Sequence, residues 1–251
     1  MYNNEGRVKN IREFELRILH HNVQSLYNKL LDINMMLTID NLNANILCST
    51  EHWLCEDHMN VLNTDQFKLL SKFFRSSSAS GGSCIFTKNT LQTKEINYLS
   101  SLGSVKVFEV SAVELADFGI ILACIYRSPD SDFYEFLGKL ETLITRVFSK
   151  GKRLILCGDL NINFLQHSGK LQELLNLLTM NNLINVVKFP TRITSHTKSP
   201  MDVVIVDNTK DDMLIKILDM GYSDHLAQFF CMKSKKIPKG PLRIIYQALY
   251  R

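Results

Sequence analysis

Residues 153–161, RLILCGDLN, carry the pattern that decides the fold. An apolar run ends at Gly158 and passes straight into Asp159 and Asn161, which is typical of a buried strand that delivers polar side chains into a loop. Comparable apolar runs predict further strands at residues 16–21, 45–50, 67–74, 84–88, 105–113, 119–126, 202–206, 213–218 and 228–232. Apolar residues at helical spacing predict helices at residues 26–37, 132–148 and 170–180. Strands therefore outnumber helices.

The helices are spaced between the strands so that they can cover the outer faces of two packed sheets. The expected fold is a four-layer α/β sandwich, with two packed mixed β-sheets flanked by helices. A chain of 251 residues with 45% hydrophobic composition is long enough to bury the core of one such domain. We expect residues 16–232 to form that domain, with 1–15 as an N-terminal extension and 233–251 as a basic C-terminal segment.

Composition excludes several classes of protein. The longest apolar run, residues 118–126, is far shorter than the roughly 18 residues that a membrane-spanning helix needs, so no span is expected. The N-terminal residues lack the hydrophobic stretch of a secretory signal, which indicates an intracellular protein. Six cysteines are scattered without the paired CxxC spacing of a zinc site, and we expect buried free thiols.

The C-terminal segment is the most basic part of the chain. The formal net charge of +4 is modest, but residues 233–251 hold six basic residues and no acidic one. A solvated tail explains this charge, and so does contact with a polyanion.

Polar and ionisable side chains recur at the predicted C-terminal ends of strands. Any one of them has a simple explanation, because Asp and Asn are common turn residues that hydrogen-bond their own backbone. Strand ends also hold side chains rigidly around a shared mouth, so the whole set indicates a site. Its members are Asn22, Glu51, Tyr126, Asp159, Asn161, Asp202, Asp224 and His225.

The order of these residues resembles the endonuclease/exonuclease/phosphatase superfamily, which includes deoxyribonuclease I, apurinic/apyrimidinic repair endonucleases and the endonucleases of non-LTR retrotransposons. Each motif alone is a weak signal, but their shared order is specific. The resemblance runs from about residue 17 to 232 and rests on HNVQSL (21–26), STEHWL (49–54), IYRSP (125–129), GDLN (158–161), MDVV (201–204) and SDH (223–225).

The resemblance implies Mg²⁺-dependent hydrolysis of a phosphodiester bond, with Mn²⁺ as a possible substitute. It places Glu51 in the metal shell and Asp224 as a second ligand, direct or through water; oxygen ligands of this kind suit a hard cation. It implies that Asp159 orients or deprotonates the attacking water, that Asn161 holds this water and a phosphate oxygen, and that Asn22 supports the metal and phosphate side.

The resemblance also implies groups that bind the phosphate. It pairs His225 with Asp202, whose carboxylate favours the charged ring that donates to a non-bridging phosphate oxygen. Tyr126 adds a second donor or helps to stabilise the leaving group. Thr194 and Arg127 are expected to contact substrate.

Other features have competing interpretations. Thr197 and Ser199 are close competitors of Thr194 for the phosphate contact. Gln24 stands where superfamily members often carry Asp or Asn, so metal support on that side is expected to be weaker. Trp53 is read as core packing rather than a base-stacking platform. A zinc site drawn from His52, Cys55 and His58 lacks a fourth ligand.

Departures from the superfamily pattern narrow the substrate. PMDVV at residues 200–204 differs from the WRLDY pattern of abasic-site repair enzymes. YRSP (126–129), GDLNIN (158–163) and PTR (190–192) look like retrotransposon endonucleases, in which nicking of the target exposes a 3′ hydroxyl that primes reverse transcription. The expected partner is double-stranded DNA, and the expected place of action is the nucleus. The expected context is a longer polyprotein with a reverse transcriptase. The Tyr/Phe-x-Asp-Asp signature of a reverse transcriptase is missing from this sequence.

Two rival functions stay open. One is a phosphatase of the same fold acting on inositol phosphates or lipids, which would call for a dedicated basic pocket. The other is a catalytically inactive or domesticated nucleic-acid-binding remnant. The complete set of expected catalytic residues argues against this alternative.

Overall fold

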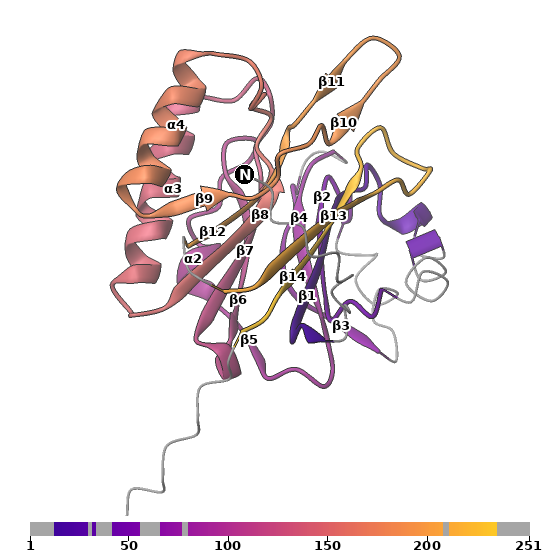
Figure 1. Ribbon diagram of the computed structural model, residues 1–251, viewed down its shortest axis with the longest axis vertical. Helices are drawn as coiled ribbons and strands as arrows, with labels where there is room; N and C mark the ends of the chain where they lie inside the picture. Colours follow the sequence, from indigo (N-terminus) through magenta and orange to yellow (C-terminus); the bar gives the residue numbers. More distant parts are fainter. Residues whose placement is uncertain are drawn as a thin grey trace, which may run out of the picture.

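The computed structural model describes residues 13–29, 32–33, 42–55, 66–76, 80–207 and 211–234. In this part of the chain, two six-stranded sheets pack against one another, and two long helices lie on the outer face of one sheet (Figure 1). Both sheets mix parallel and antiparallel pairs. The predicted sandwich of two mixed sheets is therefore confirmed.

The first sheet has the strand order β13-β14-β1-β2-β4-β3. Only β1 and β2 run parallel in it, and its other neighbouring strands are antiparallel. Its strands are β1 (Leu16–Asn22), β2 (Ile46–Thr50), β3 (Phe67–Phe73), β4 (Ser83–Lys88), β13 (Met213–Leu218) and β14 (Ala227–Met232).

The second sheet has the strand order β5-β6-β7-β8-β12-β9. Here β7 and β8 form the parallel pair, with antiparallel neighbours on both sides. Its strands are β5 (Thr93–Glu95), β6 (Glu109–Leu115), β7 (Ile120–Tyr126), β8 (Arg153–Asp159), β9 (Leu183–Asn185) and β12 (Asp202–Asp207).

Helices α3 (Phe133–Phe148) and α4 (Gly169–Met180) cover the outer face of the second sheet. Each begins where a side chain accepts a hydrogen bond from a backbone N–H of the first turn: Asp132 caps α3 and Ser168 caps α4. The buried face of α3 repeats at intervals of three and four residues, as an amphipathic helix requires. Its buried members are Phe133, Phe136, Leu140, Leu143, Ile144 and Val147.

The central core lies between the sheets, where β1, β2, β4 and β14 face β6, β7, β8 and β12. Alternate residues of each strand point into it, which follows from the two-residue period of a strand. Cys48, Cys124 and Cys157 belong to this core. Five cysteines are buried and free, as expected, whereas Cys55 is exposed, so the expectation is wrong at that one position.

A small hairpin, β10 (Arg192–Ile193) and β11 (Lys198–Ser199), extends beyond the two sheets (Figure 1). Sequence patterns missed these strands, together with β5, β9 and the short helix α2 (Asn97–Ser100), because two to four residues are too few for a periodic signal. Single turns of 3₁₀ helix occur at η2 (Tyr27–Lys29) and η4 (Ala116–Phe118).

The strand predicted at 105–113 begins instead at Glu109, because Ser104 and Phe108 form an isolated bridge around a tight turn. Half of the helix predicted at 26–37 lies outside the described residues, as do residues 1–12 of the N-terminal extension and 235–251 of the basic segment. Within the described ranges, no helix has the length and apolar character needed to cross a membrane.

Candidate active site

The polar residues predicted to form a site do converge on one end of the sandwich. Asn22, Tyr126 and Asp159 are the last residues of β1, β7 and β8, and Glu51 follows directly after β2. One part of the prediction is wrong, because Asp202 opens β12 and His225 precedes β14 rather than ending a strand.

These two positions reach the same end because their strands run antiparallel to β8 and β1. Asp202 is the register partner of Asp159, the last residue of β8. The start of an antiparallel strand therefore serves the site as well as the end of a parallel one.

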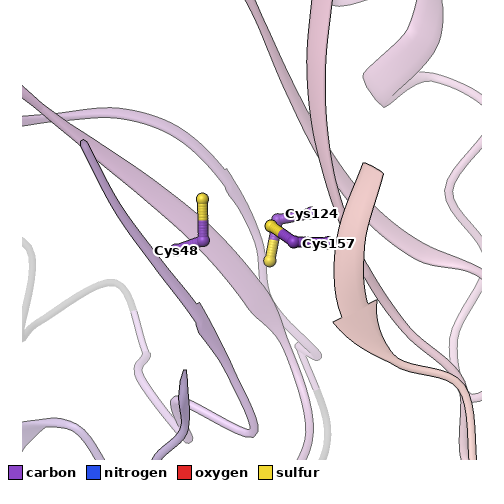
Figure 2. A group of neighbouring side chains, drawn as sticks. All are labelled: Cys48, Cys124 and Cys157. Carbon is purple, nitrogen blue, oxygen red and sulfur yellow. The ribbon is translucent and has the colours of Figure 1, made fainter. Parts of the chain in front are cut away.

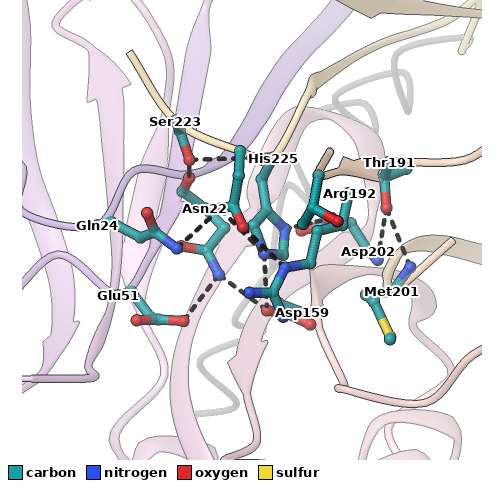
Figure 3. A network of polar contacts seen from close by, with 12 residues as sticks. Asn22, Gln24, Glu51, Asp159, Thr191, Arg192, Met201, Asp202, Ser223 and His225 are labelled. Atoms are coloured by element: carbon teal, nitrogen blue, oxygen red, sulfur yellow. Dashed lines mark hydrogen bonds and ion pairs between the residues drawn. The ribbon is translucent and has the colours of Figure 1, made fainter. Parts of the chain in front are cut away.

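A hydrogen-bonded bridge joins the two sheets at this end. The side-chain amide of Asn22 donates to Glu51 Oε1 at 3.0 Å and to Asp159 Oδ2 at 2.8 Å (Figure 3). Asn22 and Asp159 are fully buried. Asn22 Oδ1 is buried without a hydrogen-bond partner, which leaves an acceptor free inside the site.

Glu51 has a left-handed backbone, with φ of 50°. A non-glycine residue in this region costs on the order of 1–3 kcal/mol and persists only where its surroundings enforce it. Three backbone hydrogen bonds do so: Glu51 N and Trp53 N donate to the carbonyls of Gly82 and Gly81, and Ser25 N donates to the Glu51 carbonyl. The carboxylate is thus fixed at the mouth of the sandwich.

His225 pairs with Asp202 as the sequence predicted. Its Nδ1 lies 2.8 Å from Asp202 Oδ2, and both side chains are buried. Burial alone would lower the pKa of His225, but the charge and hydrogen bond of Asp202, with further help from Asp159 and Asp224, raise it to about 9. The ring is therefore an imidazolium at neutral pH.

The other ring nitrogen of His225 faces the site. His225 Nε2 lies 4.0 Å from Asp159 Oδ2 and 3.9 Å from Asp224 Oδ1, both beyond hydrogen-bond length. Its proton is therefore available to an oxygen that enters the site.

The two buried aspartates have opposite tendencies. Burial and the neighbouring charge of Asp202 raise the pKa of Asp159 to about 7. Burial would also raise the pKa of Asp202, but the charge and hydrogen bond of His225 hold it below its ordinary value. Asp202 thus stays ionised as the partner of His225, while Asp159 is poised to exchange a proton near neutrality.

Tyr126 and Asn161 complete the inner wall. Burial, followed by the charges of Glu51 and Asp159, raises the pKa of Tyr126, so its hydroxyl keeps the proton and can donate. Asn161 N donates to Asp159 Oδ1 at 2.9 Å, and its side-chain amide donates to the Arg127 carbonyl at 2.8 Å. Asn161 has φ of 50°, a conformation that asparagine tolerates better than most residues.

Asp224 lies at the edge of the site and is held by two donors. Gln24 Nε2 donates to its Oδ1 and Arg192 Nε to its Oδ2, each at 2.9 Å. Each oxygen accepts one hydrogen bond and keeps a second lone pair, so Asp224 can contact a metal directly or through water. Gln24, expected to weaken metal support, instead takes up one acceptor of this carboxylate.

Arg192 is a site residue that sequence reasoning missed. It opens β10, and its pKa is raised because hydrogen bonding and the charges of Asp224, Asp159 and Glu51 outweigh the effect of burial. The PTR stretch that contains it served only to compare the chain with retrotransposon endonucleases. Only the three-dimensional structure shows that this arginine lies near three carboxylates.

Several supporting residues were also missed. Thr191 Oγ1 accepts hydrogen bonds from the backbone N–H groups of Met201 and Asp202, both at 3.0 Å (Figure 3). Ser223 Oγ donates to the Asn22 carbonyl and accepts from His225 N. These hydroxyls tie the loops that carry Asp202 and His225 to the strands beside them.

The two predicted substrate contacts are not part of this cluster. Arg127 is 1% exposed, and its guanidinium donates to the carbonyls of Leu160, Asn161 and Ser131. It supports the turn after β8, and its contact with substrate stays a prediction. Thr194 is half-buried in the β10–β11 turn, where its hydroxyl hydrogen-bonds that of Thr197.

Residues 52 and 53 differ in burial: His52 is buried and Trp53 is exposed. Trp53 is 38% exposed, so its assignment to the core is wrong: the left-handed backbone at this position turns the ring outward. His52 Nε2 bonds the Phe73 carbonyl and its Nδ1 accepts from Leu54 N, so both nitrogens are occupied. His58 lies outside the described residues.

The donor set suits a hard divalent cation. Four carboxylates, Glu51, Asp159, Asp202 and Asp224, face the two cations Arg192 and His225, which leaves an excess of negative charge. Asp159, Asp202 and His225 offer ligand atoms within 4.8 Å of one another. His225 carries a proton on the site-facing nitrogen, however, so Glu51 and the unpartnered Asn22 Oδ1 are better placed to serve the metal.

Comparison with solved structures identifies the fold. The endonuclease domain of TRAS1, a telomere-specific non-LTR retrotransposon, matches with a TM-score of 0.67 at 18% identity, covering 88% of this chain and all of that one. The chain has the endonuclease/exonuclease/phosphatase fold. The AP endonuclease LMAP from Leishmania major matches with a TM-score of 0.69 at 13% identity, covering 90% of this chain and 91% of that one.

Further comparisons agree on this fold. The catalytic domain of Xenopus laevis APE2 matches with a TM-score of 0.64 at 16% identity, covering 88% of this chain and 93% of that one. A family model described as "Endonuclease-reverse transcriptase" matches residues 120–229, which hold β7, β8, β12 and the SDH motif. No curated protein sequence matches this chain. The resemblance inferred from the sequence motifs is confirmed.

Proposed function

We propose that this chain is a metal-dependent hydrolase of DNA phosphodiester bonds that nicks one strand of a duplex. The observation that carries the proposal is a buried pair of groups: a protonated His225 and Asp159, whose pKa is about 7. His225 Nε2 lies 4.0 Å from Asp159 Oδ2. One group is an acid and hydrogen-bond donor, and the other is a base of suitable strength. Hydrolysis of a phosphodiester needs both roles beside one phosphorus atom.

Each residue has a role that follows from its position. Asp159 orients the attacking water and accepts its proton, and Asn161 holds Asp159 through its backbone N–H. His225 donates from Nε2 to a non-bridging phosphate oxygen, and Tyr126 donates from its hydroxyl. Asn22 fixes Glu51 and Asp159 relative to one another.

Mg²⁺ fits the oxygen donors at this mouth, and Mn²⁺ is an accepted substitute in such sites. Glu51 is the proposed carboxylate ligand, supported by Asn22 Oδ1, while Asp224 acts through water. When bound, the ion neutralises the negative charge that grows on the phosphate.

The substrate class follows from the family model and from the TRAS1 neighbour. We infer a nick that leaves a 3′ hydroxyl for target-primed reverse transcription, with double-stranded DNA as partner, the nucleus as place of action and a reverse transcriptase in the same polyprotein. The half-buried Arg192 and the hairpin that begins with it lie beside the proposed catalytic residues, where they can meet a phosphate backbone.

The test is nicking of supercoiled plasmid with Mg²⁺, with and without EDTA. We expect nicked circles that a DNA polymerase extends from the 3′ hydroxyl, and no product in EDTA. Asp159→Ala should reduce the rate by about 10²–10⁴-fold, the usual contribution of general acid–base catalysis. Asp117→Ala, which removes a carboxylate from η4 before the start of β7, is the matched control and should keep wild-type activity.

Other outcomes identify the rival functions. Release of phosphate from inositol phosphates or phospholipids with an intact plasmid would favour the phosphatase. Plasmid binding with neither activity would favour the nucleic-acid-binding remnant, and either result overturns the proposal.

A further inference from the structure

Three buried cysteines meet in the core between the two sheets, directly behind the candidate active site. Cys48 comes from β2 in the first sheet, whereas Cys124 and Cys157 come from β7 and β8 in the second. Figure 2 shows Cys48 on one side and Cys124 and Cys157 next to each other on the opposite side. The cluster therefore contains thiols from both halves of the sandwich.

The three sulfur atoms lie close enough together to share one metal ion. Cys124 and Cys157 are register partners in parallel strands, and Cys48 faces them across the core. The sulfur atoms lie within 4.8 Å of one another. Sulfurs that share one Zn²⁺ at the usual bond length of about 2.3 Å lie roughly 3.8 Å apart, so small side-chain rotations suffice.

The contacts among the thiols show how a cation would be accommodated. Cys124 Sγ approaches the Ser49 carbonyl and Cys157 Sγ approaches the Ala123 carbonyl, each at 3.8 Å. The thiol protons of Cys124 and Cys157 are thus donated to backbone carbonyls, and a cation that binds both sulfur atoms would replace these protons.

A fourth ligand is not in place among the described residues. His20 is an imidazole near Cys157, but its Nδ1 bonds Gln228 Oε1 at 2.5 Å and its Nε2 bonds Thr50 Oγ1 at 3.3 Å. A site of sulfur ligands without nitrogen or oxygen selects soft ions over Mg²⁺. This separates the cluster chemically from the oxygen-lined mouth above it.

We propose that Cys48, Cys124 and Cys157 bind one thiophilic cation, Zn²⁺ or Cu⁺, which joins the two sheets. Binding involves no change of oxidation state: each thiol that becomes a ligand forms a metal–sulfur bond and releases its proton to solvent. Because all three side chains are at most 1% exposed, the ion enters as the chain folds. The inference is independent of the proposed nuclease activity.

The first experiment measures metal directly on the full chain. Wild-type protein is unfolded, reduced and refolded with Zn²⁺, with Cu⁺ or with Mg²⁺ alone, and is then analysed by native mass spectrometry and elemental analysis. We expect one Zn²⁺ or one Cu⁺ per chain, and no Mg²⁺ at the cluster. The two soft-metal samples decide which ion the site prefers.

Matched cysteine variants locate the ion. Cys124→Ser should lower the bound soft metal to below about a tenth of the wild-type amount. Cys84→Ser removes a buried thiol outside the cluster, and Cys55→Ser removes the exposed one, so both should keep one ion. Equal binding by Cys124→Ser, or loss of the ion in Cys55→Ser alone, would overturn the assignment.

A second measurement needs no variant and covers the case in which Cys124→Ser fails to fold. Metal that binds the folded chain alone adds its binding free energy to stability. The urea midpoint of wild-type protein refolded with Zn²⁺ or Cu⁺ should therefore rise above that of protein refolded in chelator. An unchanged midpoint with no bound ion shows that the thiols are ordinary core side chains, and a mass lower by two protons shows a disulfide instead.

Discussion

At the scale of single residues, the site depends on how neighbouring groups give two buried aspartates, Asp159 and Asp202, opposite tendencies to ionise. Asp202 stays ionised because His225 donates to it, whereas Asp159 has a pKa of about 7 because burial and Asp202 disfavour its charge. A sequence shows four acidic residues but not which one each neighbour stabilises. Asp159 and Asp202 influence each other because the sheet register makes them partners, although they lie 43 residues apart in the sequence.

The pH dependence of the reaction tests the His225–Asp202 pair. With the pKa of His225 at about 9, the alkaline limb of kcat/KM for wild type should lie near that pH. Asp202→Asn removes the charge that raises this pKa, so the ring loses its proton earlier and the limb moves to lower pH, toward the unperturbed value of about 6.5. His225→Gln should lack this ionisation altogether.

Profiles of the three proteins from about pH 5.5 to 9.5 are compared with their melting temperatures. A purely structural Asp202 would lower thermal stability and leave the limb where it was. One shared alkaline limb for all three proteins would show that the pair does not control the reaction.

Metal titration tests the role of Glu51. Glu51→Gln keeps the shape of the side chain and an acceptor for Asn22, but it removes the charge that attracts a hard cation. We expect the Mg²⁺ concentration for half-maximal nicking to rise by about tenfold or more, within the range seen when residues around a metal are changed. Reduced activity with an unchanged Mg²⁺ requirement would assign Glu51 to positioning instead.

At the scale of elements, the loop between β3 and β4 positions the site from outside it. Glu109 on β6 accepts hydrogen bonds from Arg75 Nε, Gly82 N and Lys106 N. Arg75 in turn lies 5.8 Å from the centre of the Tyr126 ring. One buried carboxylate therefore connects the loop that supports Glu51 to the strand that ends in Tyr126.

Glycine is required at the turn of this loop. Gly82 has φ of +92°, and an added Cβ would lie 2.4 Å from the His52 ring. A side chain at this position would displace the carbonyl that holds Glu51 in its left-handed conformation.

Glu109→Gln tests this connection. The Arg75–Glu109 pair is 2.6 Å long, with side chains 5% and 0% exposed, and breaking a buried pair usually costs about 3–5 kcal/mol. We expect the free energy of unfolding to fall by that order. Nicking at a temperature where the variant is folded should fall too, because the loop no longer fixes Glu51.

Glu135→Gln is the matched control, since its pair with Lys139 is exposed and 3.9 Å long. Exposed pairs contribute up to about 1 kcal/mol. Urea denaturation measures the stability of both variants. Equal losses in Glu109→Gln and Glu135→Gln would show that the buried carboxylate has no special role.

The sequence predicted the long elements and the convergence of the motif residues because both leave local signals. The stretch before Asp159 is apolar because β8 is buried on both faces, and α3 shows a clear amphipathic period. The burial of Arg127 and the exposure of Trp53 were not predicted, because tertiary contacts reverse the usual burial of these residue types: carbonyls and phenylalanine rings enclose the arginine, while a left-handed turn exposes the tryptophan. The cysteine cluster leaves no recognisable spacing motif in the sequence, since its three members lie on three separate strands.

At the scale of the whole molecule, the site exists only while the two sheets are packed together. Asn22, Glu51 and His225 are carried by strands of the first sheet, and Asp159 and Asp202 by strands of the second. The apolar core between the sheets lies directly behind them. Separation of the sheets would therefore abolish activity even if each sheet kept its strands.

Two core variants test whether the sandwich unfolds as one unit. Ile155→Ala opens a cavity between the sheets, and Leu140→Ala opens one between α3 and the second sheet. Each should lower the free energy of unfolding by about 2–5 kcal/mol. Since neither residue touches the site, nicking without denaturant should stay within about threefold of wild type. This is a far smaller loss of activity than the one expected for Asp159→Ala.

The informative measurement is the loss of nicking and of circular dichroism along the same urea series. If both cores belong to one cooperative unit, the two signals share a midpoint in each protein, and both variants shift that midpoint downward together. If the sheets separate first, Ile155→Ala loses nicking at lower urea than circular dichroism, whereas Leu140→Ala does not. That second outcome would contradict the single unit and would show that the contact between the sheets, rather than the fold of either sheet, limits the stability of the active site.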